Sequence, residues 1–487
     1  MEILERARRL ATVHDGRSAL DDLRDSRSIG EVAERRGLPT ARVRGVYSYY
    51  ELLHHRDRPH VCTGTACWSA RGGAAPPADT APVRCLGRCY AAPAAAIGGE
   101  VDHAAHPVPV FTLVDPPVVF RHLAHTPDLA ALYALPPHAE ILDRLEASGL
   151  RGRGGAAYPT AAKWRAAARQ PGPLKYVVVN GDEGDPGSFV DRLLLESAPH
   201  AVLAGVNACA AAIGATHGIV FVRGEYPNAA QRMRFAITEA VAAGVLVPGL
   251  TLDVKVGAGS YVVGEETALL RAIEGQRGES TPKPPYPAER GLFGRPTVVQ
   301  NVETVSIVPW ILAAGGAKPA TKAFSLSGAV ARPGAVEAPL GIPLGELLHR
   351  GGLGPAAGRR WKMALVGGPM GTVVPASRFD VGLDYTSLPG MGHGGVVVLD
   401  DTVSARALAE HLFDFARGES CGNCAPCRIG TAQLTRMADA PSLARLLDTL
   451  ELGSLCGFGQ GVPRPIRDLL ACFPEEMFPE ETGGASR

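Results

Sequence analysis

Residues 174–192, LKYVVVNGDEGDPGSFVDR, decide the fold, because an unbroken apolar run ends there abruptly in an acidic turn. Such a run predicts a short strand that is buried on both faces, as strands are in α/β proteins. The apolar runs GIVFV at 218–222 and LDVKVGAG at 252–259 repeat the pattern, with amphipathic helical segments between them. This alternation predicts an α/β domain over residues 138–318.

The acidic turn after the first run is a candidate binding site. Ligands of open α/β sheets bind beyond the carboxyl ends of the strands, where Asp182, Glu183 and Asp185 stand. These carboxylates repel one another unless a ligand, such as a sugar or the polar edge of a ring system, donates hydrogen bonds to them. The alternative is a turn that is exposed to solvent.

Glycine-rich turns and spare amides lie in the same domain. GLRGRGGAAYPTAAKW at 149–164 and GAGSYVVGEETALL at 257–270 each lead into a predicted helix, so their backbone N–H groups can face a phosphate. TPKPPYP at 281–287 is a rigid segment, and RPTVVQNVET at 295–304 places two amides at the start of a predicted helix. Although each segment alone is also compatible with a plain loop, together they suit two nucleotide-like ligands.

The C-terminal cysteines have the spacing of an iron–sulfur site. ESCGNCAPCRIGT at 419–431 carries three cysteines in C-x2-C-x2-C spacing, and a fourth follows at Cys456. Three thiolates on one loop with a distant fourth suit a [4Fe-4S] cluster, in which each iron takes one cysteine. The alternative is zinc, which more often takes two separated cysteine pairs. Cys472 and the isolated Cys209 lie in apolar helical segments and are expected to be core residues.

The rest of the chain is predicted to form further domains. Residues 1–55 are predicted to be helical. A helix, a Gly-Leu-Pro turn and a second helix in this segment also fit a helix-turn-helix DNA-binding motif. However, residues 1–60 carry 12 basic and 10 acidic groups and lack the basic stripe that DNA binding requires. The remaining chain is predicted to form a small α/β domain at 56–118, a proline-rich connector at 103–137 with one strand at 110–114, a β-rich domain at 320–400 and a helical domain at 402–475.

Composition excludes some classes of protein. Among 487 residues, Lys plus Arg equals Asp plus Glu, so net charge favours neither nucleic acid nor a membrane surface. Met1–Leu10 reads as an amphipathic helix and not as a signal peptide, and Ala201–Val222 reads as a buried helix that leads into a buried strand. A cytoplasmic protein without direct membrane insertion is therefore expected.

The ordered motifs GRGGAAYPTAAKW, NGDEGDPG, GAGSYVVGEETALL, PKPPYP, TVVQNVET and ESCGNCAPCRIGT resemble the NADH-binding flavoprotein subunit of respiratory complex I over about residues 138–475. The same module occurs in NAD-dependent formate dehydrogenases and NAD-reducing hydrogenases. The N-terminal motifs RVRGVYSYYEL, VCTGTACW and RCLGRCYAAP resemble the thioredoxin-like [2Fe-2S] subunit of these complexes. The resemblance implies a Rossmann-like FMN and NAD domain, a β-grasp domain and a C-terminal helical bundle with an iron–sulfur cluster.

The resemblance also implies site residues. FMN would lie against Arg153, Gly154, Gly155, Lys163, Asn180, Asp182, Glu183, Tyr261, Gly264, Glu265, Gln300, Asn301 and Thr304. NAD would stack near Tyr158, Glu183, Glu266, Lys283 and Tyr286, with tyrosine at 158 and 286 in place of the commoner phenylalanine. The cluster ligands would be Cys421, Cys424, Cys427 and Cys456 for [4Fe-4S], and Cys62, Cys67, Cys85 and Cys89 for [2Fe-2S], with zinc as the alternative at the second set.

The sequence departs from the family pattern in three places. Ala166 stands where the family usually has an aromatic residue, so we expect a differently shaped adenine site. The gaps from Cys67 to Cys85 and from Cys427 to Cys456 are short, which predicts a reduced thioredoxin-like domain and a trimmed helical bundle.

The expected reaction is hydride transfer between NAD(H) and FMN, with Glu183 and Glu265 shaping nicotinamide binding, followed by single-electron transfer to the clusters. The chain shows no molybdenum- or nickel-binding sequence, so other redox subunits are expected as partners, most specifically those of a formate dehydrogenase. A hydrogenase diaphorase, a complex I-like NADH dehydrogenase and a non-catalytic iron–sulfur scaffold or sensor are the alternatives.

Overall fold

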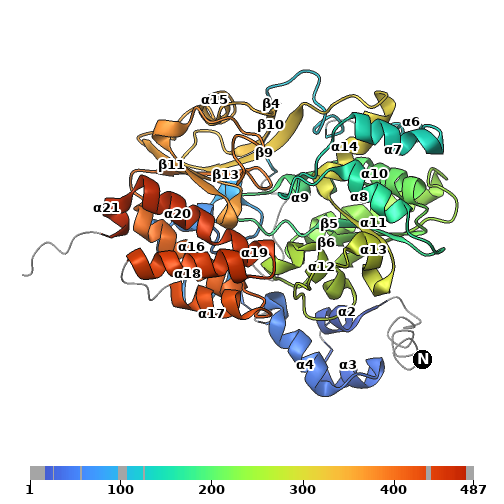
Figure 1. The fold of residues 1–487 in the computed structure, drawn as a ribbon, viewed down its shortest axis with the longest axis horizontal. Coiled ribbons are helices and arrows are strands. Elements are labelled where there is room, and N and C mark those ends of the chain that lie inside the picture. The colour runs from blue at the N-terminus through green and yellow to red at the C-terminus, as the bar shows by residue number, and fades with distance from the viewer. Residues whose placement is uncertain are drawn as a thin grey trace, which may run out of the picture.

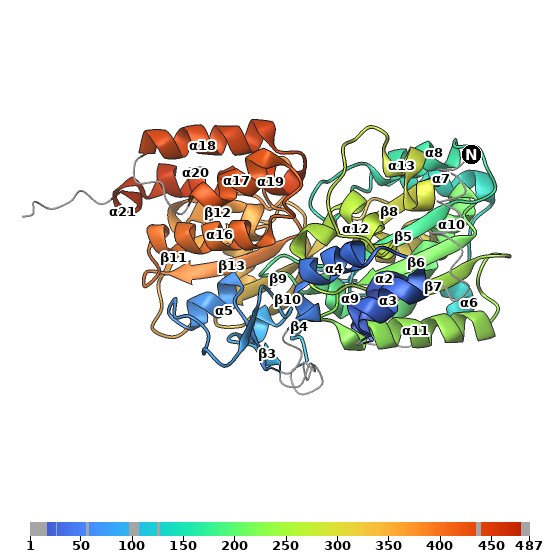
Figure 2. The ribbon, with the colours of Figure 1, turned by 90° about the horizontal axis from the view of Figure 1, so that it is seen from below.

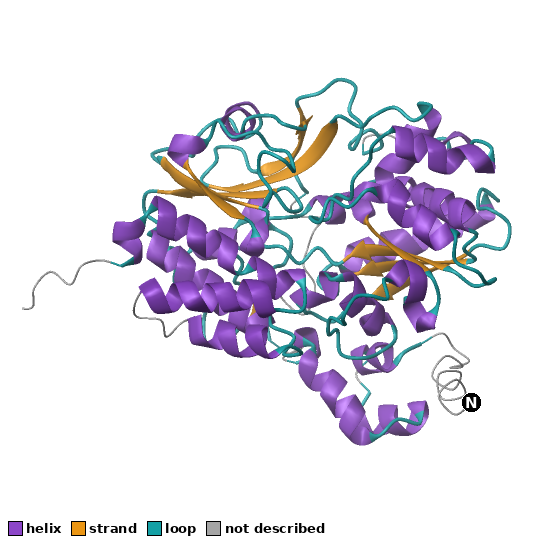
Figure 3. Ribbon diagram, in the orientation of Figure 1, coloured by secondary structure: helices purple, strands orange, loops and turns teal. Residues whose placement is uncertain are grey.

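The computed structural model of the chain describes residues 17–25, 27–54, 58–96, 107–123, 127–434 and 440–478. Two large sheets form separate layers, each covered by helices, with the C-terminal helices packed beside the second sheet (Figures 1 and 3). The predicted helix Met1–Leu10 lies outside the described residues.

The α/β domain is built on a four-stranded parallel sheet with strand order β7-β6-β5-β8. Its strands are β5 (Tyr176–Gly181), β6 (His217–Val222), β7 (Thr251–Val256) and β8 (Thr297–Asn301). Its helices are α6 (Leu129–Leu132), α7 (His138–Ala147), α8 (Thr160–Ala168), α9 (Val190–Ser197), α10 (Pro199–Ile213), α11 (Pro227–Ala242), α12 (Glu266–Ile273), α13 (Pro287–Arg290) and α14 (Val302–Ala313). The three predicted strands are confirmed as β5, β6 and β7.

Alternate residues of β5 enter two different cores, as a strand buried on both faces requires. Val177 and Val179 pack in the core that contains α10 and α14, whereas Val178 packs in the core that contains α12 and the N-terminal helices. The N-terminal helices are α2 (Ala19–Arg24), α3 (Ile29–Arg36) and α4 (Thr40–Tyr49). The segment that resembles a helix-turn-helix therefore covers one face of the sheet with its apolar side chains.

Strand β8 was missed in the sequence. The pattern there predicts only the start of a helix, but the residues form an edge strand that runs parallel to β5 and ends at Asn301. The helix prediction is correct from that point, since the Asn301 side chain accepts the Thr304 N–H and caps α14. The amides of Gln300 and Asn301 therefore stand at the carboxyl edge of the sheet, beside the end of β5.

The β-rich domain is a six-stranded mixed sheet in the order β12-β11-β13-β9-β10-β4. Its elements are β4 (Val110–Thr112), β9 (Thr321–Gly328), β10 (Gly334–Pro339), α15 (Leu344–Arg350), β11 (Trp361–Val366), β12 (Thr372–Pro375) and β13 (Gly395–Asp400). Strands β10 and β12 were not predicted. The strand predicted at 110–114 forms as β4, and it adds a parallel edge to β10, far along the chain.

The N-terminal cysteine region is a small three-stranded sheet, β2-β1-β3, with one helix. Its elements are β1 (His60–Cys62), α5 (Thr65–Ala70), β2 (Ala81–Val83) and β3 (Ala95–Ala96). Figure 2 shows α5 lying against the sheet of the β-rich domain, where it contacts β9 and β13. The region is small, and its expected relation to a thioredoxin-like domain stays a prediction.

The C-terminal region is helical as predicted. Its helices are α16 (Ala405–Glu419), α17 (Ala425–Leu434), α18 (Ala440–Gly453), α19 (Gly457–Gly461), α20 (Pro463–Cys472) and α21 (Pro474–Met477). Cys472 is half-buried at the end of α20, so its assignment to the core was wrong, whereas Cys209 is fully buried in α10 as predicted.

Within the described residues, no single helix is both long and apolar enough to cross a membrane. Helices α9 and α10 would satisfy length and composition only together, and their axes are bent by 94° at the break between them.

Candidate functional site

The predicted nucleotide-binding residues converge at the carboxyl edge of β5 and β8. Asn180 and Asn301 are paired in the parallel register of these strands. The Asn180 side-chain amide donates to the carbonyl of Gly264 at 2.7 Å, and its carbonyl oxygen accepts the Asp182 N–H at 3.1 Å. The acidic turn and the second glycine-rich turn are therefore held together by one asparagine.

The first glycine-rich turn lies against the end of β8. The Arg153 N–H donates to Thr304 Oγ1 at 2.8 Å, and a Cβ on Gly154 would lie 3.1 Å from the Asn301 Cβ. Gly155 has φ +115°, a backbone conformation that L side chains rarely adopt. Glycine is thus required here for the backbone to approach the amides of β8 and leave its N–H groups facing the site.

A cluster of two lysines and two glutamates joins the remaining segments. Lys163 Nζ lies 3.1 Å from Glu266 Oε2, and Lys283 Nζ lies 2.9 Å from Glu265 Oε1 and 3.1 Å from Glu266 Oε1. Burial by itself would raise the pKa of Glu266, but Lys163 and Lys283 outweigh it and lower that pKa. The cluster fixes the 281–287 segment against α12 and places two ammonium groups where phosphates are expected.

Glu183 and Glu265 each cap a helix. Both oxygens of the buried Glu183 carboxylate accept backbone N–H groups at the start of α9, from Asp191 and Arg192 at 3.0 Å. Glu265 Oε2 accepts the N–H groups of Thr267 and Ala268 at the start of α12. Each carboxylate stabilises the positive end of its helix, so the geometry gives both residues a scaffold role. Their predicted contact with nicotinamide stays a prediction.

Several functional groups were missed in the sequence. Asp185 Oδ1 accepts the Tyr261 hydroxyl at 2.5 Å, and His393 of the β-rich domain reaches across to Asp191 of α9 at 2.9 Å. Asp185 belongs to the acidic turn, where the sequence assigns it no individual role. His393 lies between glycines in the run MGHGG, a pattern that by itself gives no sign of which domain the side chain meets.

Buried polar atoms without a partner surround the site. They include Arg153 Nε and Nη1 and Asp182 Oδ2. Burial raises the pKa of Asp182 to about 8, since no positive group offsets it fully. Donors and acceptors left unsatisfied in one place fit a polar ligand with several hydrogen-bonding groups, as a flavin nucleotide has.

Tyr158 and Tyr286 remain exposed, each at 55% of its surface. Their exposed ring faces suit stacking against a flat ring. The two residues flank the site through the glycine-rich turn and the 281–287 segment that carry them.

The C-terminal cysteines gather at the ends of α16, α17 and α18. Cys421 and Cys427 are buried, whereas Cys424 and Cys456 are half-buried. The Leu455 N–H lies 3.5 Å from Cys424 Sγ. Burial, with Cys424, Cys456 and Cys421 nearby, raises the pKa of Cys427 to about 12, so four thiolates coexist there only beside a positive metal centre.

The N-terminal cysteines are buried to a greater extent. Cys62, Cys67, Cys85 and Cys89 are all at most 3% exposed, and the Cys85 and Cys89 sulfurs lie 3.7 Å apart. Backbone N–H groups approach three of these sulfurs, from Gly87 to Cys85 (3.3 Å), Ala94 to Cys67 (3.4 Å) and Gly187 to Cys89 (3.2 Å). Such donors stabilise the negative charge of cluster sulfurs.

Sulfur spacing can be compared with what a single metal ion requires. Four thiolates at about 2.3 Å from one zinc ion lie about 3.8 Å from each other. In the described part of the chain, a single trio of histidine, cysteine and carboxylate ligand atoms lies within 4.8 Å, and it is Glu183, Asp191 and His393. The Cys85 and Cys89 sulfurs, 3.7 Å apart, are therefore spaced as two thiolates on one metal ion, whether that ion is zinc or one iron of a cluster.

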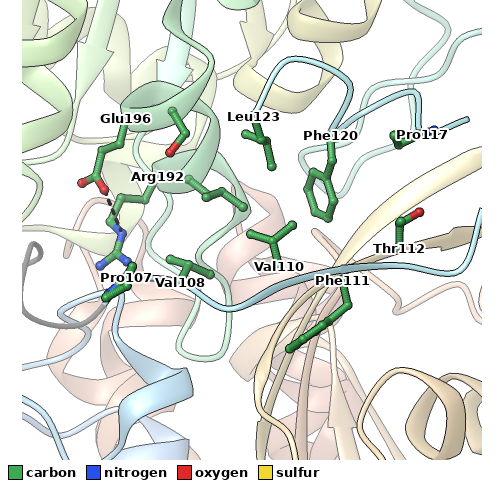
Figure 4. Close-up of a pocket in the computed structure, with 12 residues that line it drawn as sticks. Pro107, Val108, Val110, Phe111, Thr112, Pro117, Phe120, Leu123, Arg192 and Glu196 are labelled. Atoms are coloured by element: carbon green, nitrogen blue, oxygen red, sulfur yellow. Dashed lines mark ion pairs between the residues drawn. The ribbon is translucent and has the colours of Figure 1, made fainter. Parts of the chain in front are cut away.

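Two cavities lie away from these residues. One of about 510 Å³ is lined by the connector and by α9, with the Arg192–Glu196 ion pair (3.9 Å) on one wall (Figure 4). The other lies between the N-terminal helices and the amino ends of β5, β6 and β7. Since ligands of parallel sheets bind at the carboxyl edge, neither cavity is the nucleotide site.

Comparison with known proteins agrees with this arrangement. Residues 145–310 match the Nuo51 FMN-binding domain, 324–374 the SLBB domain, and 407–479 the iron–sulfur binding region of NADH-ubiquinone oxidoreductase-F. The matches show FMN, NADH and a [4Fe-4S] cluster as the cofactors of this module. The N-terminal cysteine region, residues 58–96, has no counterpart among these three matches.

The chain is 39% identical over 379 residues to the NADP-reducing hydrogenase subunit HndC of Solidesulfovibrio fructosivorans, covering 72% of this chain and 77% of that protein. It is 39% identical over 369 residues to an NADH-quinone oxidoreductase subunit of Rhizobium meliloti, covering 69% and 88%. A solved structure of an NAD⁺-reducing [NiFe]-hydrogenase in the H2-reduced state has a TM-score of 0.83 at 31% identity, covering 94% and 91%. The chain therefore belongs to the family of NADH-binding, FMN-containing iron–sulfur oxidoreductase subunits that complex I shares with NAD-reducing hydrogenases.

Proposed function

We propose that this subunit exchanges electrons between NAD(H) and two iron–sulfur clusters through one FMN, which sits among the residues gathered at the carboxyl edge of β5 and β8. The observation that carries the proposal is the convergence of both glycine-rich turns, the acidic turn and the Asn180 and Asn301 amides at that edge. FMN, when bound, takes up a hydride and releases its electrons singly.

The chain's own residues bind and align the two nucleotides. Lys163 and the N–H groups of Gly154 and Gly155 supply positive charge and donors for a phosphate, while the Arg153 N–H holds the turn against Thr304. Tyr158 and Tyr286 offer stacking faces for the second nucleotide. Among the described residues assigned to the nucleotides, Arg153 directs its guanidinium to the carbonyls of Pro319 and Thr321 and leaves no arginine for a 2′-phosphate, so we propose NAD in preference to NADP.

The N-terminal cysteines are proposed to hold the [2Fe-2S] cluster. Four buried sulfurs arranged as two pairs, with backbone N–H donors to three of them, match the needs of a rhombic cluster with two thiolates on each iron. The Gly187 N–H that reaches Cys89 belongs to the acidic turn, so the two sites share one loop. This supports a second electron acceptor beside the flavin.

The parent complex is proposed to contain further redox subunits. The formate dehydrogenase context that we expected has no support among the relatives, which are named as hydrogenase and NADH-quinone oxidoreductase subunits. The match to the NAD⁺-reducing hydrogenase covers 94% of this chain. The sequence matches cover only 72% and 69% of this chain. The larger share covered by the hydrogenase structure favours a hydrogenase-type diaphorase.

Spectroscopy of the purified, iron-reconstituted protein tests the proposal. We expect flavin absorption that NADH bleaches, one FMN and six irons per chain, and reduction of both clusters on addition of NADH. A protein that holds its iron but binds no FMN would refute the flavin site. Co-purification from the native host, followed by assays with hydrogen and with formate, separates the two candidate complexes.

A further inference from the structure

We propose that His393, from the β-rich domain, is a positioning residue of the flavin site. Its imidazole bridges Asp191 and Glu183 of the FMN domain and, through Asp191, holds Asn301 and the glycine-rich turn in the shape that binds FMN. The inference rests on the proposed function, because it assigns FMN to that turn.

The loop that carries His393 places this side chain against the FMN domain. It is flanked by Gly392 (φ +56°) and Gly394 (φ +94°), and a Cβ on Gly394 would strike the Lys322 side chain at 2.7 Å. His393 is 5% exposed, and its Nε2 lies 2.9 Å from Asp191 Oδ2 while its Nδ1 lies 3.7 Å from Glu183 Oε1. A single ring thus faces two buried carboxylates from another domain.

A continuous chain of hydrogen bonds leads from His393 to the flavin site. Asp191 Oδ2 also accepts the Asn301 side-chain amide at 2.6 Å, and Asp191 Oδ1 accepts the Glu303 N–H at 3.1 Å. Asn301 caps α14 at Thr304, whose hydroxyl accepts the Arg153 N–H. A Cβ on Gly155 would lie 3.7 Å from Gly392, so the two loops also touch directly. Moving His393 therefore moves the wall of the flavin site.

A charged imidazolium accounts for this geometry without a metal ion. Each oxygen of Glu183 and Asp191 already accepts one N–H group and keeps a further lone pair, which an N–H of the ring can use. Without a cation between them, the two buried carboxylates would repel each other. A doubly protonated ring supplies that cation and a donor toward each side.

The surrounding charges favour the protonated ring. Burial lowers the pKa of His393, but Asp191 and Glu183 outweigh it and raise that pKa to about 9, while Lys322 opposes them. Lys322 is itself paired with Glu303 at 2.7 Å, and Asp185 is a further carboxylate that interacts with the ring. Since the folded pKa of about 9 lies above the unfolded value of about 6.5, the charged ring contributes its full stability below pH 6.5, and this contribution is lost as pH rises through 9. In the folded protein the ring itself stays charged until the pH approaches 9.

Titration of the reconstituted full-length protein with FMN, followed by flavin fluorescence between pH 6 and 9.5, tests the proposal. We expect His393→Gln to weaken FMN binding at pH 7 by about 10-fold, the usual scale of coupling between linked sites. Wild-type affinity should fall as pH rises toward 9, whereas the variant should lack that component. Any titration of FMN itself is common to all variants.

His349→Gln is the matched control, a histidine of the same domain that packs against Trp361 away from this bridge. Glu183→Gln is the second variant: it keeps an acceptor at α9 but removes one charge beside His393, so the pH at which FMN binding weakens should shift downward. Iron content and thermal unfolding verify that each variant is folded.

The outcomes are distinct. Equal FMN affinity and equal pH profiles in wild type, His393→Gln and Glu183→Gln would overturn the role of His393 while leaving the flavin site intact. Failure of the wild-type protein to bind FMN would instead overturn the proposed function. A non-iron divalent ion that is lost in His393→Gln would make the trio a metal site and also overturn the inference.

Discussion

The two cysteine sites use the same ligand in opposite settings. At the N-terminal site all four cysteines are at most 3% exposed and lie on a small sheet and its loops. Cys89 contacts the acidic turn, through the N–H of Gly187. At the C-terminal site the ligands come from helix ends, and Cys424 and Cys456 are half-buried. Ligand spacing thus indicates the type of cluster that each site is proposed to hold, whereas burial determines which electron donors or acceptors can approach it. The partly exposed C-terminal site, the open site, is suited to electron transfer with a partner subunit, and the buried N-terminal site to electron transfer with the flavin alone.

The largest expected effect is loss of the C-terminal cluster. Cys427→Ser removes one of the two buried ligands there, so we expect loss of about four irons per chain and of the [4Fe-4S] signal in electron paramagnetic resonance. FMN bleaching by NADH should persist, while electron delivery to a partner should stop. Cys472→Ser, a half-buried cysteine outside both sets, is the control and should keep all its iron.

Loss of the N-terminal cluster is the next largest effect. Cys62→Ser should remove about two irons and leave the [4Fe-4S] signal unchanged, because the two sets share no ligand. Electron delivery to a partner should continue, as the exit through the open site is intact. If the iron content of this variant equals that of wild type, the N-terminal cysteines do not hold a cluster and the comparison fails.

The contact between the N-terminal region and helix α16 is expected to matter more than exposed ion pairs do. Arg84 Nη1 lies 2.9 Å from Asp414, and its Nε lies 3.5 Å from the buried Glu419. Arg84→Ala leaves Glu419 without this cation, and we expect a loss of roughly 1–3 kcal/mol in the free energy of unfolding. Arg467→Ala, which breaks exposed pairs in the C-terminal helices, should change it by less than about 0.5 kcal/mol. Denaturant titrations of both variants give the comparison.

The smallest expected effect is an acid sensitivity of the same contact. His411 of α16 stacks on Trp68 with ring centroids 4.5 Å apart, and burial lowers the pKa of His411 to about 4. A folded pKa below the unfolded value gives stability that is present above pH 6.5 and lost as pH falls toward 4. At pH 5 the loss is about 1–2 kcal/mol.

His411→Phe keeps a flat ring on Trp68 but cannot take a proton. Thermal unfolding at pH 7.5 and at pH 5 should therefore differ less for this variant than for wild type. Equal pH dependence of the two proteins would show that the protonation of His411 does not differ between its folded and unfolded states over this range.

Sequence patterns predicted the parts of the fold that are set locally. Strands β5, β6 and β7, the buried pair α10 and β6, and the ligand spacings of the C-terminal cysteines follow from apolar runs and short motifs. Strand β10 (GAVEAP) was missed because it is rich in alanine with glycine and proline at its ends, and β12 (TVVP) was missed because it has only four residues. They form through pairing with β9 and β11, which is a tertiary effect.

The candidate site shows the same limit. Motifs located the turns that carry Asn180, Asn301 and Lys163, and the structure brings these residues together. They did not indicate that Glu183 caps α9, nor that His393 reaches Asp191 from 202 positions along the chain. Contacts between domains depend on how the domains pack, and no local pattern in the sequence records that packing.

Strand β4 fixes the position of the N-terminal cysteine region relative to the β-rich domain. Its pairing with β10 anchors the chain soon after the cysteine-bearing segment, so that segment is tethered on both sides, by α2–α4 on one sheet and by β4 on the other. A separate protein of the same kind would have to be recruited from solution at its cellular concentration. A tether replaces that concentration with a far higher local one, so a cluster domain this small can remain docked through contacts too weak to hold an independent subunit.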